Sequence, residues 1–512
     1  MSYIKSILTN AISNWANLIV SLAISFFMAP FILKSIGSTY FGIWMLVTQT
    51  TGYLWLLDFG VRESVIKYVA EFNEKKDFSF LNEILGSAIR IYSIICVACI
   101  IFSAILSLVF PYLFNVVKEN AITAQLVVIV TGIDIAQAFF FNIFTGIVMG
   151  FQRYDIFSKI NIGFSVVRAI ITIIFLSHGY GIVALSIIQL SFNLLTNIII
   201  YHSSRKLLPI KIFALKKIDK STKAKRLILN YSFFVLLNNL SLQAIFYSSN
   251  IIIAAFLPIS YVTFYAISSN LIEYLKKLIF TGTQVFAPLT SQLDAKNDPE
   301  TIAKLLINGS KYSLLLCLPV SIVYILLGNQ FISLWMGAEY SEISGTILSI
   351  LSISIIFSAP HYTMQGILFG LNKHNVLAYV RTIESTINIA LSIFLVKKYG
   401  VIGVALGAAI PHLATVILVL PALTANIVKL KLVRLLKQAY ISPILSAIPF
   451  TIAICLTKNF FTPISLLSFF CEIATLMIIY LFSIAIISLN HDQRSFIREK
   501  AFASLIPIFR RN

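Results

Sequence analysis

The chain has 512 residues, of which 58% are hydrophobic and 12% are charged. Globular proteins have about 45–50% apolar and about 25% charged residues, so this composition excludes an ordinary soluble protein. The net charge of +19 could suggest nucleic-acid binding. On so apolar a chain, we expect instead an attraction to the anionic lipids of a membrane surface.

Apolar runs recur from one end of the chain to the other, and each is long enough to cross a hydrocarbon core about 30 Å thick. They predict an all-α polytopic membrane protein with fourteen spans. The predicted spans are residues 8–33, 39–66, 85–110, 122–149, 160–177, 180–201, 227–257, 261–290, 306–327, 344–369, 375–396, 400–425, 440–457 and 464–489. Short glycine turns at 177–181 and 398–400 predict antiparallel neighbours.

The distribution of Lys and Arg predicts the orientation of these spans. With a cytoplasmic N-terminus, five of the 39 basic residues fall in outside connections. These five are Lys34, Lys118, Lys397, Lys398 and Lys458. Because cytoplasmic connections carry the excess of Lys and Arg, we expect both termini in the cytoplasm.

One basic connection divides the chain. Residues 203–226 hold nine Lys or Arg and one Asp, and they follow six spans and precede eight. The predicted parts are an N-terminal lobe (1–202), a basic cytoplasmic linker (203–226), a C-terminal lobe (227–425), two further spans (426–489) and a basic cytoplasmic tail (490–512). Similar short turns after residues 36 and 258 indicate two lobes built on one plan, as in many transporters.

Ionisable side chains inside the spans are candidate functional groups, because a charge at membrane depth is costly. Counting 1.5 Å per residue places Asp134, Glu273 and Glu384 near the middle of the membrane. Arg168 and Arg381 are expected somewhat nearer the cytoplasm. Asp58 and Arg62 are expected in the cytoplasmic quarter of a span.

Several of these charges have a spacing that lets an acid and a base meet on one helix face. The pairs are Asp58–Arg62, Glu63–Lys67, Glu273–Lys277 and Arg381–Glu384. The first two lie in residues 54–71, which are expected to form one continuous helix. Paired faces of this kind should point at water or at another helix rather than at lipid.

Some of the candidate groups allow two interpretations. Asp134 is either a proton-exchanging site or the acceptor of a hydrogen bond between helices. Arg62 is either a substrate-binding group or the end of a helix emerging among the lipid headgroups. Asn14 and Asn238, at equivalent places in the first and seventh spans, either bridge helices or touch a polar ligand.

Motifs of enzymes and metal sites are missing from the sequence. It contains no Walker A loop, HExxH, GxSxG or Cys/His metal spacing. Cys96 and Cys99 form a CxxC inside an apolar run, where small packing side chains are expected. We therefore expect neither an enzyme nor a protein with a metal or cofactor.

The chain resembles the polysaccharide flippases of the multidrug/oligosaccharidyl-lipid/polysaccharide (MOP) superfamily, the Wzx-like exporters of O-antigen and capsule units. The residues that carry the resemblance are Asn14, Pro30-Phe31, Gly37-x-x-x-Phe41-Gly42, Leu57-Asp58-Phe59-Gly60-Val61, Lys67-Tyr68-Val69-Ala70-Glu71 and Tyr261-x-x-x-Tyr265. By topology the resemblance covers essentially the whole chain.

The resemblance implies two six-helix lobes around a cationic central cavity, two extra C-terminal helices, and alternating access. Its implied substrate is an oligosaccharide on undecaprenyl pyrophosphate, flipped across the bacterial inner membrane. Implied partners are this lipid-linked substrate and membrane lipids, with a polysaccharide polymerase and a chain-length regulator as candidate protein partners and no nucleic acid.

The basic residues expected to bind such a substrate follow from its charge, since arginine's planar fork suits phosphate. The candidate substrate-binding residues are Arg62, Lys277, Arg381, Arg168, Asn14 and Asn238. The candidate counter-charge or ion-coupling residues are Asp58, Glu63, Asp134, Glu273 and Glu384. Two other functions stay open, a multidrug or cation antiporter of the related class and a non-transporting scaffold of a glycan assembly complex.

Overall fold

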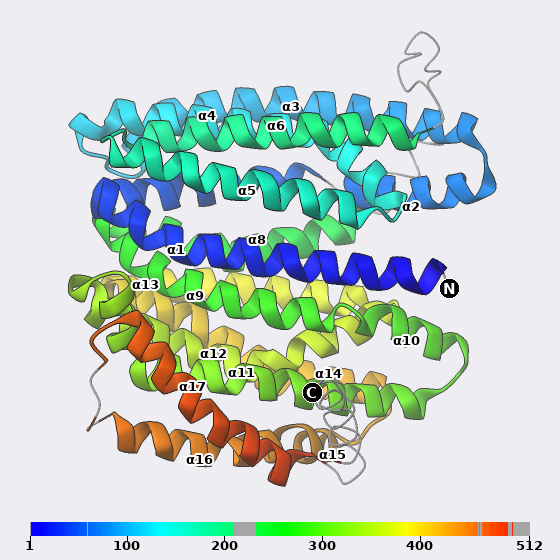
Figure 1. Cartoon of the computed structure of the whole chain (residues 1–512), viewed down its shortest axis with the longest axis vertical. Helices are drawn as coiled ribbons and strands as arrows, with labels where there is room; N and C mark the ends of the chain where they lie inside the picture. The colour runs from blue at the N-terminus through cyan, green and yellow to red at the C-terminus, as the bar shows by residue number, and fades with distance from the viewer. Residues whose placement is uncertain are drawn as a thin grey trace, which may run out of the picture. The chain divides into compact units, whose positions relative to one another are not determined.

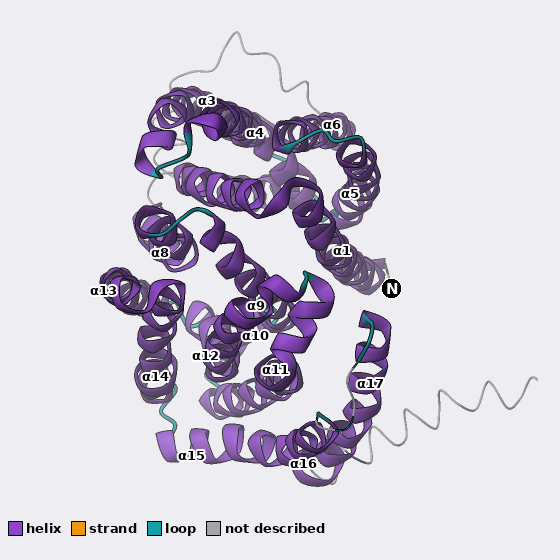
Figure 2. Ribbon diagram, turned by 90° about the vertical axis from the view of Figure 1, so that its left-hand side faces the viewer, coloured by secondary structure: helices purple, strands orange, loops and turns teal. Residues whose placement is uncertain are grey.

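The computed structural model describes residues 2–58, 60–208, 232–458, 460, 463–489 and 494. In this part of the chain the regular secondary structure is helical, without a strand (Figure 2). The first helices are α1 (Ser2–Gly52), α2 (Val61–Lys75), α3 (Phe78–Leu113), α4 (Lys118–Gly150), α5 (Tyr154–Ser177), α6 (Ile182–Leu207) and α8 (Ser232–Phe256). The others are α9 (Ser260–Thr283), α10 (Phe286–Ala295), α11 (Pro299–Trp335), α12 (Ala338–Gly370), α13 (His374–Ala414), α14 (Leu420–Ile427), α15 (Leu432–Leu436), α16 (Ser442–Thr457) and α17 (Leu466–Ser483).

Ten helical stretches among the described residues are long and apolar enough to cross a membrane. The helix α1 has 51 residues, which is about 76 Å at 1.5 Å per residue and more than two crossings. It bends at Gly37, whose positive φ of 78° is not helical, and α13 bends in the same way at Gly400. Each long stretch therefore supplies two crossings. With α8 and α9, which are long enough to cross, the described helices provide the fourteen spans predicted.

The chain divides into two compact units. The first contains residues 1–266 and 381–404, and the second contains residues 267–380 and 405–512. The division therefore falls within α9 and α13. The linker residues 209–226 and, apart from residue 494, the tail 490–512 lie outside the described residues, so their predicted roles stay predictions.

Within the first unit, α4 is the central helix. It packs against α3, α6 and α2, and α5 lies between α6 and α1 (Figure 1). Large apolar side chains such as Tyr92, Phe139 and Phe144 are fully buried where α3 and α4 meet. In the second unit, α11 and α12 form the most extensive helix pair, and α16 packs along α11.

Both units contain the same local arrangement after a short helix. In the first, Lys76 takes the left-handed conformation after α2, and the Asp77 carboxylate accepts a hydrogen bond of 3.1 Å from the Phe80 amide. In the second, Asn297 is left-handed after α10, and Asp298 accepts one of 3.0 Å from the Thr301 amide. Each Asp caps the helix that follows. The repeat of this arrangement supports the prediction of two halves built on one plan.

Paired glycines let these short helices lie close to a long neighbour. On α4, a Cβ at Gly150 would lie 2.7 Å from Val69 Cβ of α2. On α12, a Cβ at Gly370 would lie 2.6 Å from the Ala287 carbonyl oxygen of α10. Each glycine follows another four residues earlier, Gly146 and Gly366, so both sites are of the Gly-x-x-x-Gly type that permits close helix approach in membranes.

We expect Gly370→Ala to lower the free energy of unfolding by about 1–3 kcal/mol, because the added methyl group overlaps backbone that cannot move freely. Gly282→Ala, on α9 with no neighbouring atom within 4 Å, is the matched control. It should be neutral or stabilising by up to about 1 kcal/mol, since alanine favours helix. Thermal unfolding of the purified protein in detergent measures both. Equal effects of the two substitutions would contradict the close approach.

Candidate substrate-binding site

A buried carboxylate lies at the centre of a polar network in the first unit. Asp134 of α4 is 5% exposed. It accepts hydrogen bonds of 3.0 Å from Gln137 Nε2, 3.0 Å from Gln189 Nε2, and 3.0 and 2.8 Å from Asn193 Nδ2. Asn197 Nδ2 extends the network with a 3.0 Å bond to Gln137 Oε1. Both carboxylate oxygens are thus surrounded by donors, as a buried charge requires.

The amide side chains of this network come from one face of α6. Gln189, Asn193 and Asn197 are spaced by four residues, which places them above one another on a helix. The sequence analysis selected charged residues and missed these amides. Their spacing, opposite the Asp134 and Gln137 pair of α4, is the signal that could have found them.

Arg168 of α5 joins the network from the other side. Its Nη1 donates to Asn193 Oδ1 over 3.3 Å, while the amide nitrogen of the same Asn193 contacts Asp134. Asn193 therefore bridges the cation and the carboxylate. This geometry supports the helix-bridging interpretation of Asp134, and its role as a counter-charge for Arg168 stays a prediction. Proton exchange at Asp134 stays a prediction.

The expectation of one continuous helix over residues 54–71 is wrong. A 3₁₀ helix covers Tyr53–Asp58, and Gly60 has a left-handed φ of 71° before α2 begins at Val61. Asp58 and Arg62 are therefore not on one helix. Asp58 instead accepts a hydrogen bond from the hydroxyl of Tyr92, a fully buried side chain of α3.

Replacing Tyr92 with phenylalanine tests this contact. We expect the change to lower the free energy of unfolding by about 1–3 kcal/mol, because the Asp58 carboxylate loses a donor in a partly buried place. The aromatic packing against Phe139 is kept. Tyr112→Phe, at a highly exposed position of the same helix, is the control and should be neutral. Thermal unfolding of both variants decides, and a neutral Tyr92→Phe would show that the bond does not stabilise the fold.

The pairing expected for Arg62 is also different. Its Nη2 lies 3.1 Å from Glu63 Oε1, and both side chains are more than one-third exposed. Lys67 is exposed and lies over the Tyr68 ring, 5.2 Å from the centroid. For Arg62 the physical reason is the break at Gly60, which places Asp58 outside α2. Glu63 and Lys67 lie on the same helix, and there Glu63 pairs with Arg62 instead of Lys67. Arg62 is therefore a half-buried residue of the short helix α2.

In the second unit, Glu273 pairs with a different lysine from the one expected. Lys276 Nζ lies 2.9 Å from Glu273 Oε1, and the Glu273 side chain is 35% exposed. The Lys277 side chain is exposed. Both lysines are within reach of Glu273 on a helix, at three and four residues, so spacing alone could not choose between them.

Two charges buried as deeply as Asp134 lie on α13. Arg381 and Glu384 are 5% and 4% exposed, and Asn388 is 1% exposed one turn further on. Their spacing places the three on one helix face, and Ser392 continues the face with a 3.4 Å hydrogen bond to Asn388 Oδ1. The sequence predicted the shared face of Arg381 and Glu384. Such buried charges are compatible with a binding function, because burial alone destabilises them.

The two asparagine candidates differ in what the structure describes. Asn14 Oδ1 accepts a bond of 3.4 Å from Ser158 of α5, and one turn earlier Asn10 donates to the Gln152 carbonyl over 2.8 Å. Asn14 thus bridges α1 and α5. Asn238 lies on α8, but its side chain is outside the described residues.

The structure distributes the candidates over both units. Glu273 and Lys277 belong to the second unit, and the other candidates belong to the first. Asp134 and Arg168 meet in one network, and Asp58 lies close enough to Arg62 and Glu63 to interact with them electrostatically. A cavity shared by both lobes stays a prediction. Among the described residues, no group of three or more His, Cys, Asp or Glu is arranged to hold a metal ion.

Ten described stretches of membrane-crossing length, with charged side chains buried among them, define a polytopic membrane protein. The model of the polysaccharide biosynthesis protein family matches residues 4–294, more than half of the chain, and a second model, MatE, matches residues 235–394. The chain therefore belongs to the polysaccharide biosynthesis protein family, the polysaccharide flippases of the MOP superfamily.

Two similar proteins carry related names. The "Putative O-antigen transporter" of Shigella flexneri is 23% identical over 415 residues, 79% of this chain and 94% of the relative. The "Probable low-salt glycan biosynthesis flippase Agl15" of Haloferax volcanii is 23% identical over 408 residues, 78% of this chain and 80% of the relative. Both similarities extend over most of the chain.

Solved structures share the fold. The lipid II flippase MurJ in an inward closed conformation has a TM-score of 0.72 at 18% identity, covering 94% of this chain and 98% of MurJ. An inward-facing multidrug resistance MATE family transporter has a TM-score of 0.62 at 14% identity, covering 84% and 96%. At these identities the likeness shows the fold alone.

Proposed function

We propose that this protein flips undecaprenyl-pyrophosphate-linked oligosaccharide units from the inner to the outer leaflet of the bacterial cytoplasmic membrane, by alternating access. The observation that carries the proposal is Arg381, an arginine 5% exposed at membrane depth on a face shared with Glu384 and Asn388. The names of the relatives from Shigella flexneri and Haloferax volcanii support a glycan as cargo.

In this mechanism the pyrophosphate is the part of the substrate that most resists crossing the hydrocarbon core. A guanidinium group binds phosphate oxygens through two parallel N–H bonds, which offsets part of the loss of hydration. Arg381 is the first candidate for this contact, with Glu384 as its counter-charge. Arg168, held by Asn193, is the second.

The orientation proposed for the chain has both termini in the cytoplasm. The asymmetry of Lys and Arg supports it. In this orientation α2 and α10 lie at the cytoplasmic ends of the spans, and so do Asp77 and Asp298, which cap the helices α3 and α11 that follow them. The half-buried Arg62 and the exposed Glu63 and Lys67 of α2 then lie on the side from which the lipid-linked substrate enters.

Deleting the gene in its native host tests the proposal. We expect loss of surface polysaccharide and accumulation of lipid-linked oligosaccharide accessible only from the cytoplasmic leaflet, both restored by the wild-type gene. The match to the MatE model makes a multidrug antiporter the second candidate. Unchanged surface glycan together with increased sensitivity to cationic dyes would identify that antiporter and refute the flippase.

A scaffold function predicts a different result from the same strain. A triple variant, Arg62→Ala with Glu273→Gln and Arg381→Ala, would still restore the glycan if the protein only assembled other enzymes. We expect the triple variant to be present in the membrane at a normal level and to leave the glycan absent.

A further inference from the structure

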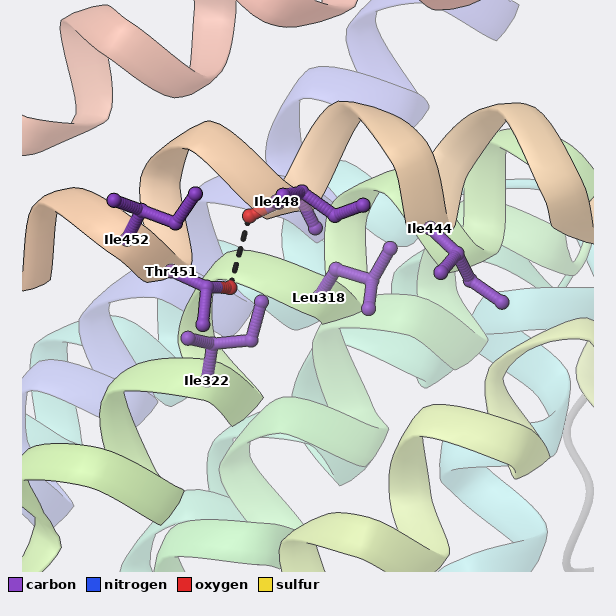
Figure 3. A pocket seen from close by; sticks show the side chains of 7 residues that line it. Leu318, Ile322, Ile444, Ile448, Thr451 and Ile452 are labelled. Carbon is purple, nitrogen blue, oxygen red and sulfur yellow. Dashed lines mark hydrogen bonds between the residues drawn. The ribbon is translucent and has the colours of Figure 1, made fainter. Parts of the chain in front are cut away.

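An apolar groove runs along the second unit where α16 packs against α11 (Figure 3). Its volume is 230 Å³. The lining residues are Leu318 and Ile322 of α11 and Ile444, Ala447, Ile448, Thr451 and Ile452 of α16. The Thr451 hydroxyl donates to the Ala447 carbonyl over 2.9 Å, so it turns to its own helix. The groove therefore presents hydrocarbon to whatever occupies it.

A polar cavity of 390 Å³ lies further along the same pair of helices. It is lined by Ile325, Leu326, Asn329 and Gln330 of α11, Thr346 and Ser349 of α12, and Lys458 after the end of α16. Lys458 Nζ donates one hydrogen bond of 2.8 Å to the Leu326 carbonyl. An ammonium group has three N–H donors, so within the described part of the chain two remain for a ligand, beside the amides of Asn329 and Gln330.

The residues that line the groove and those that line the cavity follow one another closely in the sequence, both on α11 and at the end of α16. On α11, Ile322 of the groove and Ile325 of the cavity are one turn apart. On α16, Ile452 of the groove is six residues before Lys458, which is about 9 Å. Lys458 directly follows the last residue of the membrane-crossing helix. The seam thus has a hydrocarbon part at membrane depth and a cationic, hydrogen-bonding part at the membrane boundary.

We propose that this seam binds one anionic phospholipid of the surrounding membrane, with its phosphodiester at Lys458 and one acyl chain in the groove. The charge of Lys458 is complementary to a phosphate, and the amide donors suit its oxygens. A soluble anion would leave the apolar groove unused, whereas a lipid fills both parts. None of the lining residues is a candidate for transport, so this site is independent of the proposed function.

Two acidic residues lie near the same end of the helices: Glu342 of α12, one turn before Thr346 of the cavity, and Glu472 of α17. Glu472 of α17 interacts with the Thr457 side chain, next to Lys458 in the sequence. No ion pair between Glu472 and Lys458 is present among the described residues. If the Lys458 charge were neutralised by an ion pair with Glu472, it would attract a lipid phosphate only weakly.

Lipid titration of the full-length protein tests the proposal. The protein is purified in detergent, stripped of lipid, and its melting temperature is followed with added phosphatidylglycerol, phosphatidylcholine, undecaprenyl phosphate or inorganic phosphate. We expect phosphatidylglycerol to raise the melting temperature more than the other three. A larger effect of undecaprenyl phosphate would show that the seam binds a polyprenyl lipid rather than a phospholipid. An equal effect of inorganic phosphate would show that the seam binds an anion without an acyl chain.

Two substitutions locate the effect. Lys458→Gln should weaken the apparent affinity for phosphatidylglycerol about tenfold, the equivalent of one charge-assisted hydrogen bond. Ile448→Trp fills the groove at a lipid-facing position and should weaken it by a similar factor. Lys118→Gln removes the same charge at the start of α4 and should have no effect.

A third variant tests the neighbouring acid. Glu472→Gln should leave the affinity for phosphatidylglycerol unchanged or increase it, because a negative charge near the phosphate is removed. The proposal fails if Lys458→Gln and Lys118→Gln behave alike, or if Ile448→Trp binds the lipid as the wild type does.

Discussion

Replacing Asp134 with alanine is expected to lower the free energy of unfolding by about 3 kcal/mol. The change leaves the amides of Gln137, Gln189 and Asn193 without their shared acceptor, and it leaves the Arg168 cation without a counter-charge. Breaking a buried charged network by removing one partner typically destabilises a protein by about 3–5 kcal/mol. Hydrogen bonds between membrane helices contribute less, which places the expected value at the lower end.

Thermal unfolding in detergent measures the effect, and Thr131→Val is the matched control. Thr131 is equally buried one turn earlier on α4, and its hydroxyl donates within the same helix, to the Val127 carbonyl over 2.7 Å. The control should change the free energy of unfolding by less than about 1 kcal/mol. If Asp134→Ala and Thr131→Val are equally mild, the network does not hold α4, α5 and α6 together.

A second substitution of Asp134 distinguishes its two candidate roles, helix bridging and proton exchange. Asp134→Asn keeps the shape of the side chain and removes its negative charge. A helix-bridging group should lose stability and keep the pH dependence of transport in the molecules that remain folded. A proton-exchanging group should lose that pH dependence even where the fold is intact. Transport measured against pH in proteoliposomes gives the answer.

The fold could be predicted from the sequence because apolar run length determines the number of crossings. Runs of crossing length recur along the chain, and glycines at positions 37 and 400 separate two crossings within one long helical stretch. The predicted turn after residue 36 and that after residue 258 also lie together within the first unit, where Thr263 donates to the Ser38 carbonyl over 2.7 Å.

The break between Asp58 and Val61 could not be predicted in the same way. A single glycine is tolerated inside many helices, so Gly60 alone does not predict the end of a helix. What fixes the conformation lies far away in the sequence. Gly52 has Tyr247 of α8 against it, and Asp58 is bound by Tyr92 of α3. These tertiary contacts override the local helical pattern.

The candidate site was predicted less well than the fold, because side-chain partners depend on which helices are neighbours. Asp134 was found as a buried acid, but its partners on α6 are uncharged amides that composition does not single out. Arg62 was assigned to the wrong acid because the helix begins after Asp58. Arg381 and Glu384 were assigned to one face correctly, since both lie within an uninterrupted part of α13.

Replacing Arg381 with alanine should reduce transport of the lipid-linked oligosaccharide by at least about tenfold. Under the proposed function, the guanidinium binds a pyrophosphate oxygen while the substrate crosses the membrane. A hydrogen bond to a charged group contributes about 1.5–3 kcal/mol, which corresponds to about ten- to a hundredfold. The rate at which newly made surface glycan appears in the complemented deletion strain measures the change.

Because Arg381 is buried, its loss also removes a positive charge beside Glu384, and the variant could be poorly folded. The amount of folded protein, measured by fluorescence-detected size exclusion of a tagged chain, therefore has to accompany each rate. Arg381→Lys keeps the charge but not the planar fork, and we expect it to fold and to transport at a reduced rate. Lys67→Ala, which removes an exposed cation from α2, should transport normally. Normal transport by well-folded Arg381→Ala would remove this arginine from the substrate path and leave Arg168 as the second candidate for the pyrophosphate contact.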